Sequence, residues 1–546
     1  MITINNVLTP LIDQFLKLNQ GITVCTPRYP NDRKLLVKLV TLVGDIVATH
    51  KVAGFMSHSA TKLCSWCEIK ASERQELQAG RLRNGQNVLA VSSRWKTLES
   101  KASQKKLAQK TGIRWSELNW LPYWDPVLNV SLGVMHNWFE GILQHHFRYR
   151  WGCELNEAKK VVNYEDVSSD EGNTMDVDDC DGSLNSESDG FDGFLPEPSK
   201  KKILAQIQEV VVPKGITRIP VQLGAAKAGK LKASEWHALF GIYLPLASMD
   251  ILWSSKAELT NDNSKLLINL CSLIQCTNIL SRKSFTKADC IKFSQTYELY
   301  QKTSMDLFKE LWGPPMGISE FGGESLIGAL QGYKTNFLIG KMEQTMMKKF
   351  NQLQRLEQKT QLLTKVSRNG AGYKFEMKEE TYNTVLQYLR RHKPNLRDYR
   401  DLPHPTNALI LQNYSKSYRS IEWKLGLKIS TLPPNNFIEY KDSNAKHFGK
   451  ICYILDLVSK EIHSGPLLVV QCFEPVGGHK CGMLNSLLEE ISVWHVKESH
   501  RLEIVPMEKI GSLAAVHTLP AWSLGISSVS LLIKPITNIL DFTINL

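Results

Sequence analysis

One carboxylate and one pair of thiols near the start of the chain are the side chains best suited to metal chemistry. Asp45 follows the apolar run at residues 34–43, which predicts a short buried strand. A carboxylate at the end of such a strand is a rigid oxygen ligand, of the kind that nucleases need to hold two metal ions about 3.5–4 Å apart. The alternative is that Asp45 only forms a turn after the strand.

Cys64 and Cys67 have the Cys-x-x-Cys spacing of a zinc knuckle, in which one turn presents both thiolates. A redox pair has the same spacing but lies between a strand and a helix, whereas residues 57–61 read as a loop. Tetrahedral zinc needs further ligands, for which His58 and His136 are candidates. The remaining interpretation is two unliganded cysteines packed in a core.

A third group of residues, Gly229-Lys-Leu-Lys-Ala-Ser-Glu-Trp-His237, precedes an apolar helix. Ser234 is expected to cap this helix, which places Glu235 in its first turn. The basic side chains beside it are candidate DNA contacts: Lys227, Lys230 and Lys232. Elsewhere, His136 and Glu140 lie one helical turn apart, where they could share a metal ion.

Periodicity predicts the elements that position these residues. We expect helices at 2–20 and 134–150, the latter with an apolar face of Met135, Trp138, Phe139, Ile142 and Leu143, and strands at 451–458 and 466–473. We expect five regions along the chain. The first two are a partial α/β core at 1–60 and an insertion at 61–164, followed by an acidic disordered linker at 165–199. A mainly helical region at 200–425, with its longest helix at 341–366, precedes a β-rich domain at 426–546.

Charge points to nucleic acid as the partner. The formal net charge is +12, but residues 165–192 contain 11 acidic residues and no Lys or Arg, so the remainder of the chain carries +23. An excess of this size favours a polyanionic partner. The 11 cysteines, an odd number, fit reduced thiols of the nucleus or cytosol better than a disulfide framework. No apolar run reaches the roughly 18 residues of a membrane span, so we expect no membrane partner.

The order of these motifs resembles the transposases of the CACTA (En/Spm) type in the form found in fungal transposons. The resemblance covers about residues 7–250 and depends on the succession of motifs rather than on any one of them. These are the segment Asn6-Val-Leu-Thr-Pro-Leu11, the strand ending in Asp45, the Gly-Phe loop with its cysteine pair, the Met-His helix at His136, and Leu231-Lys-Ala-Ser-Glu-Trp-His237 followed by Leu244-Pro245.

This resemblance implies an α/β plus α fold: an incomplete RNase H-like core with a large helical insertion and a small β-rich C-terminal domain. It assigns Asp45 as the second catalytic carboxylate, Glu235 as the third, and Cys64, Cys67 and His136 as a zinc cluster. The family's first catalytic Asp lies upstream of the segment with which this chain begins. In addition, Gly133 stands where the family's Asp-x-x-His motif has its Asp.

Three functions therefore stay open. The first is a nuclear, catalytically incomplete transposase relic with structural Zn²⁺ that retains DNA or chromatin binding. The second is a fragment of an active DDE/D transposase, which would use Mg²⁺ or Mn²⁺ and whose true start lies upstream. The third is a zinc-containing scaffold for protein interactions that does not bind DNA.

Overall fold

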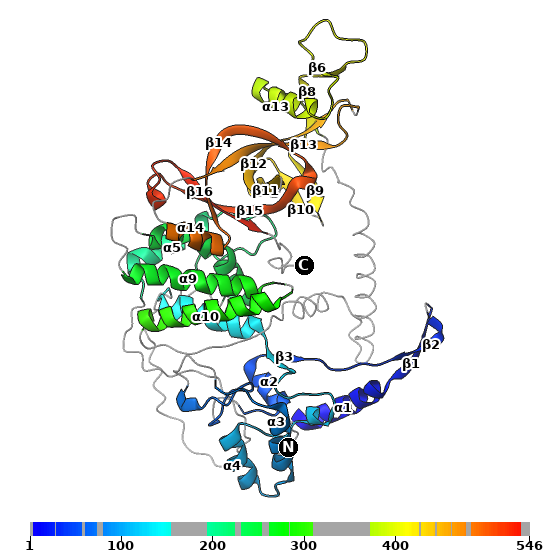
Figure 1. Cartoon of the computed structure of the whole chain (residues 1–546). Helices are drawn as coiled ribbons and strands as arrows, with labels where there is room; N and C mark the ends of the chain where they lie inside the picture. The colour runs from blue at the N-terminus through cyan, green and yellow to red at the C-terminus, as the bar shows by residue number, and fades with distance from the viewer. Residues whose placement is uncertain are drawn as a thin grey trace, which may run out of the picture.

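Three parts follow one another along the molecule, as Figure 1 shows: an N-terminal part, a layer of helices and a β-barrel. The computed structural model describes residues 4–27, 29–56, 60–73, 80–153, 194–223, 231–253, 261–282, 284–308, 372–424, 427–442, 445–459, 461–476 and 482–536.

The N-terminal part is built around α1 and a short parallel strand pair. α1 (Ile4–Gln20) is amphipathic and buries Leu8 and Ile12 in a small core with Phe55 and Trp124. β3 (Leu42–Gly44) pairs in parallel with β4 (Val130–Leu132). The remaining elements are β1 (Ile22–Thr26), β2 (Tyr29–Leu35), α2 (Ile46–Ala53), η1 (Ala71–Glu73), α3 (Gly85–Thr97), α4 (Lys101–Thr111) and η2 (Glu117–Trp120).

The helical layer starts directly after β4 with two π-type helices, η3 (Met135–Leu143) and η4 (His146–Arg150). The apolar face predicted for this helix is buried, including Trp138 and Phe139. The other helices are α5 (Glu197–Glu209), α6 (Ala233–Ala238), η6 (Leu239–Tyr243), α7 (Leu244–Ala247), α8 (Met249–Leu252), α9 (Asn261–Leu280) and α10 (Lys287–Phe308).

The C-terminal part is a closed barrel of six antiparallel strands. Neighbours follow the order β11-β15-β16-β14-β13-β12, and the pairing of β11 with β12 closes it. The strands are β11 (Phe437–Asp442), β12 (Ala445–Leu457), β13 (Pro466–Pro475), β14 (Trp494–Val505), β15 (Ile510–Leu519) and β16 (Ser530–Ile536), with α14 (Gly482–Glu490), η7 (Met507–Lys509) and η8 (Ser523–Gly525) in its connections.

A smaller set of elements extends the barrel sheet at its far end. β5 (Tyr373–Glu376) pairs with β8 (Tyr414–Ser417), which in turn pairs with β12. α13 (Glu379–Arg390), β6 (Leu396–Asp398) and β7 (Leu409–Leu411) cover this end, while β9 (Ser420–Lys424) and β10 (Leu427–Ser430) form a hairpin of their own.

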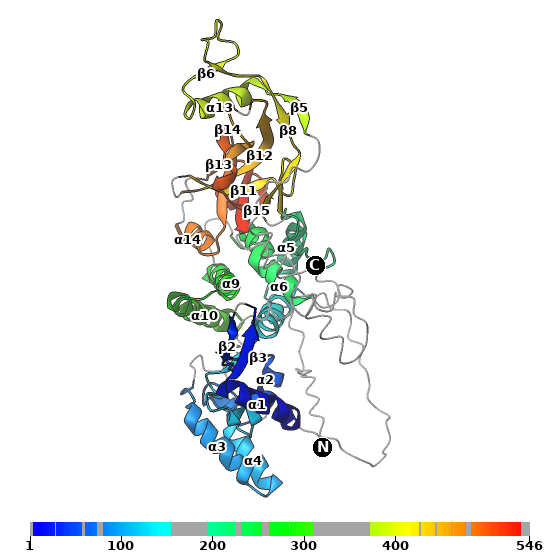
Figure 2. The ribbon, with the colours of Figure 1, turned by 90° about the vertical axis from the view of Figure 1, so that its right-hand side faces the viewer.

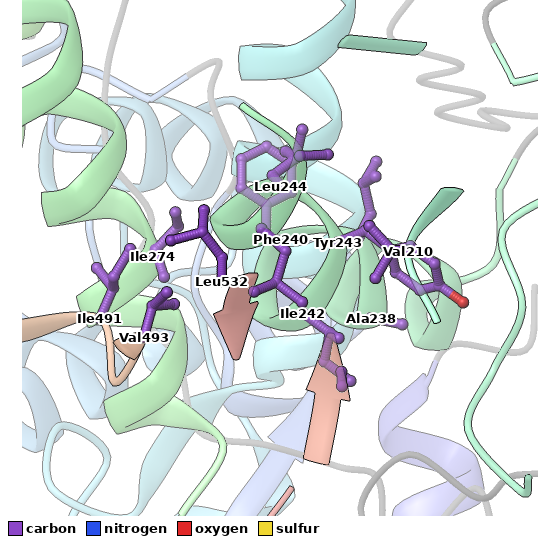
Figure 3. Packing of buried hydrophobic residues seen from close by; sticks show 14 of the residues in the cluster. Val210, Ala238, Phe240, Ile242, Tyr243, Leu244, Ile274, Ile491, Val493 and Leu532 are labelled. Atoms are coloured by element: carbon purple, nitrogen blue, oxygen red, sulfur yellow. The ribbon is translucent and has the colours of Figure 1, made fainter. Parts of the chain in front are cut away.

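One core joins the helical layer to the barrel. Figure 3 shows Ile491 and Val493, which follow α14, beside Ile274 of α9, and Leu532 of β16 between that group and Phe240 of η6; all of them belong to one buried cluster. A backbone bridge continues the contact, because Val211 and Val516 exchange hydrogen bonds of 2.8 and 2.9 Å. Burial of this many aliphatic side chains, each worth about 1.5–3 kcal/mol, holds the two parts together.

The predicted fold class is wrong. In place of a small β-rich domain on an RNase H-like core, the C-terminal region forms a closed six-stranded antiparallel barrel that packs on a layer of helices (Figure 2). The described part of the N-terminal region contains two separate two-stranded sheets, β1–β2 and the short parallel β3–β4 pair, in place of the expected core sheet. Sequence reasoning identified β12 and β13 correctly, but it missed the partner strands that close the barrel.

Two further expectations are corrected. The apolar run at 34–43 is not a buried strand, since β3 is only three residues long and Leu36 and Val40 are exposed. The region at 200–425 is helical only in part, because residues 373–424 contain five strands and α13. The helix expected at 2–20 is confirmed as α1, whereas the one at 341–366 and the acidic linker up to residue 193 lie outside the described residues.

No helix among the described residues has both the length and the apolar character needed to cross a membrane.

Candidate functional site

Asp45 lies where the sequence places it, immediately after β3, and its carboxylate caps α2. Its Oδ1 accepts a hydrogen bond of 2.7 Å from the backbone N–H of Ala48, and the side chain is exposed. Because β3 and β4 are parallel and Gly133 donates to the carbonyl of Gly44 at 2.8 Å, the start of the His136 helix lies at the same edge. The local role of Asp45 is thus helix capping.

His136 and Glu140 contact each other directly on the first turns of η3. The His136 Nδ1 and Glu140 Oε2 atoms are 2.8 Å apart, and both side chains are more than one-third exposed. This is the i,i+4 pair expected from the sequence, formed here as a direct contact at the surface.

Glu235 also caps its own helix. It occupies the first turn of α6, as predicted, and its Oε2 accepts a 2.7 Å hydrogen bond from the backbone N–H of Lys232. The helix begins earlier than expected, with Lys232 rather than Ser234 at the cap. α6 packs against η3, where the rings of Phe139 and His237 are 4.8 Å apart. The two motif helices are therefore neighbours.

The cysteine pair forms a tight turn that is fixed by a buried arginine. The backbone N–H of Trp66 donates to Cys64 Sγ at 3.3 Å. Nε of Arg83 donates to the carbonyl oxygens of Cys64 and Cys67 at 2.8 and 3.1 Å. The remaining guanidinium nitrogens reach the carbonyls of Thr111 at 3.0 Å and Lys62 at 3.2 Å. One side chain thus connects the turn to the end of α4.

The two thiols differ in acidity. A hydrogen bond from the Cys64 thiol stabilises the thiolate of Cys67 and lowers its pKa to about 6. The same hydrogen bond, together with burial, raises the pKa of Cys64. Two neighbouring thiols on one turn, one of them with a lowered pKa, are suited to binding a soft metal ion.

The predicted third ligand, His136, is not gathered with this pair. Trp66, between the two cysteines, donates from Nε1 to the carbonyl of Val130 at 2.9 Å, at the start of β4, whereas His136 follows the end of that strand. In the part of the chain that the structure describes, no three His, Cys, Asp or Glu side chains form a group able to hold a metal ion. His58 lies outside that part.

Of the predicted DNA-binding lysines, only Lys232 can be placed. It is exposed at the start of α6, while Lys227 and Lys230 lie outside the described residues.

A larger basic surface lies on α4, which sequence analysis left without a role. Four lysines occupy one side of this helix, and all of them are exposed: Lys101, Lys105, Lys106 and Lys110. The opposite side packs inward through Leu107 and the buried Ala108. No ion pair to these four lysines is found among the described residues, and residues 101–110 contain no Asp or Glu. We call this surface the lysine face of α4.

The position of α4 is set by contacts with α3. Nε2 of Gln104 donates to the backbone carbonyl oxygens of Trp95 and Leu98 at 3.3 and 3.0 Å. The backbone carbonyl of Gln104 accepts a 2.9 Å hydrogen bond from Nε1 of Trp95. The lysine face therefore belongs to a rigid helical hairpin. The signal for it was visible in the sequence as four lysines without an acidic residue, at helical spacing.

An aromatic group borders the same hairpin. Nζ of Lys96, on α3, lies 4.0 Å from the ring centre of Trp115 and 4.4 Å from that of Trp120, which is 54% exposed. Exposed aromatic and cationic groups next to each other are frequent on nucleic-acid-binding surfaces.

Comparison with known proteins gives no match: no family model, no curated protein and no solved structure matches this chain.

Proposed function

We propose that this chain is a nuclear, transposase-derived protein that binds double-stranded DNA through the lysine face of α4. The observation that carries the proposal is the set of four exposed lysines, on a helix held rigidly against α3, with no carboxylate paired to them in the described residues. Phosphate oxygens are acceptors that this surface does not find among the described residues.

The order of sequence motifs supports the transposase ancestry, and the charge supports the choice of DNA. Residues 1–153 contain 20 Lys and Arg against 10 Asp and Glu, so the region around α4 is strongly basic. Exposed lysines of this kind contact the phosphate groups of DNA, and phosphate contacts do not distinguish one base from another. We therefore propose binding that depends little on sequence.

The test is the salt dependence of DNA affinity, measured with the full chain and a labelled duplex of mixed sequence. Each phosphate contact contributes about −0.9 to the slope of log K against log salt, so four contacts give a slope of about −3.6 or steeper. A flat response between 50 and 200 mM salt, or no binding at about 10⁻⁴ M protein at 50 mM salt, would contradict the proposal.

We also propose that the turn at Cys64 and Cys67 binds a structural zinc ion. Cys64 and Cys67 would supply two sulfur ligands on one turn, and tetrahedral zinc needs two more. Metal analysis should find about one zinc per chain, lost in Cys64→Ser and kept in the control Cys290→Ser, which changes an exposed thiol on α10. Equal zinc content in both variants would exclude the cysteine turn.

A further inference from the structure

The ribbon formed by β1 and β2 projects from the N-terminal part as an arm (Figure 1). Its strands pair antiparallel, with Ile22 opposite Leu35 and Thr23 opposite Lys34. The side chains are exposed or half-buried along β1, and exposed at residues 31–35 of β2. Both faces of the ribbon are therefore open within the described part of the chain.

The base of the arm is fixed even though its faces are open. Leu18, in the last turn of α1, accepts backbone hydrogen bonds of 3.2 Å from both Gly21 and Val37, so both ends of the arm are attached to that helix. Gly21 has a φ of +98°, and the side chain of Lys34 crosses directly over it. This positive φ lies in the left-handed region that favours glycine, so the glycine helps to set the direction of the arm.

A two-stranded ribbon is marginally stable in water when nothing covers it. The arm also contains an irregularity, since the register shifts between Val24 and Thr26 and Asp32 adopts a φ of +60°. A bulge of this kind increases the twist of the ribbon. An exposed, twisted ribbon on a fixed base is suited to gaining its stability from a partner.

The positive charge of the arm favours a polyanionic partner. Residues 21–40 contain four basic side chains against one acidic residue, and Arg33 and Lys34 are exposed and adjacent on β2. Because their neighbours in β2 alternate between the two faces, these two cations lie on opposite faces of the ribbon. Charged residues on short strands disfavour pairing with a second copy of the arm. A major groove of DNA, about 12 Å wide, admits a two-stranded ribbon between two rows of phosphates.

We propose that the β1–β2 arm enters a groove of double-stranded DNA, with Arg33 and Lys34 contacting the phosphates on either side. This inference rests on the proposed DNA binding and assigns it a second contact, distinct from the lysine face of α4. Thr23, opposite Lys34 on the same face, is then placed to meet base edges.

Cys25 makes the proposal directly testable, because it is an exposed thiol in the middle of β1. The full chain is incubated with a duplex carrying a mixed disulfide tethered to a base, with the tether position varied along the duplex. A thiol within reach forms a protein–DNA disulfide. We expect a cross-link that is lost in Cys25→Ser and retained in Cys290→Ser.

A binding measurement complements the cross-link. In the double variant R33Q/K34Q, we expect a DNA affinity about tenfold lower at 100 mM salt and a salt slope reduced by about 1.8, with an unchanged melting temperature because neither side chain is buried.

The outcomes separate the two proposals. If the wild type binds DNA but Cys25 does not cross-link and R33Q/K34Q binds normally, the arm proposal is overturned while the lysine face stands. A Cys25–Cys25 disulfide between chains, without DNA, identifies a second copy as the occupant and also overturns it. If the wild type does not bind DNA at all, both proposals fail.

Discussion

Replacing the four lysines of α4 by glutamine should lower the affinity for duplex DNA at least about a hundredfold at 50 mM salt, because about four phosphate contacts and the release of their counterions are lost together. Glutamine keeps a similar helix propensity and removes the charge, although its side chain is shorter. Since Lys101, Lys105, Lys106 and Lys110 are all exposed, the fold should persist. Fluorescence anisotropy with the full chain measures the effect.

The matched control removes the same charge from the part of the chain at residues 372–536, on β5, β8, β10 and β11. It changes four exposed lysines that form no ion pair among the described residues: Lys374, Lys416, Lys428 and Lys441. This control should bind DNA within a few-fold of the wild type. Equal losses in both variants would mean that only net charge matters and that α4 is not the contact surface.

Arg83→Ala should destabilise the N-terminal part by about 3–5 kcal/mol, because it removes a buried cation that donates to four backbone carbonyls and leaves those oxygens unpaired. The loss should also loosen the link between the cysteine turn and the end of α4. Hydrogen exchange of residues 60–133, read out by mass spectrometry, measures the effect locally.

Arg81→Ala is the control for this prediction, since Arg81 is exposed two residues away on the same segment. It should change exchange rates little, because surface substitutions usually stay within about 0.5 kcal/mol. We also expect Arg83→Lys to be destabilising, since an ammonium group lacks the planar fork that reaches carbonyls on two segments, residues 62–67 and Thr111. Protection in Arg83→Ala equal to that in Arg81→Ala would contradict the prediction.

Local periodicity predicted several elements correctly. Helix α1, the apolar face of η3 and strands β12 and β13 follow from side-chain spacing, which depends only on near neighbours in the sequence. The barrel also requires pairing between strands far apart in the chain, such as β11 with β15. The spacing of side chains within one strand does not reveal which distant strand it pairs with. The predicted fold class was wrong for this reason.

The features of the candidate site also fall into two groups: those that follow from local sequence and those that depend on contacts between distant segments. Asp45 and Glu235 were placed correctly at a strand end and in a helix turn, but their hydrogen bonds to backbone N–H groups show capping roles that their positions alone did not predict. Arg83 was missed because its four acceptors come from segments that are not adjacent in sequence. The lysine face could have been predicted, because its residues all lie on one helix.

The most direct test of DNA binding through α4 is the slope of log K against log salt for the wild type and for the variant with four glutamines on α4, measured side by side on the same duplex. The proposal predicts a slope shallower by about 3.6 in the variant, or about 0.9 for each lysine removed. Equal slopes would show that these lysines do not contact phosphates and would contradict the account.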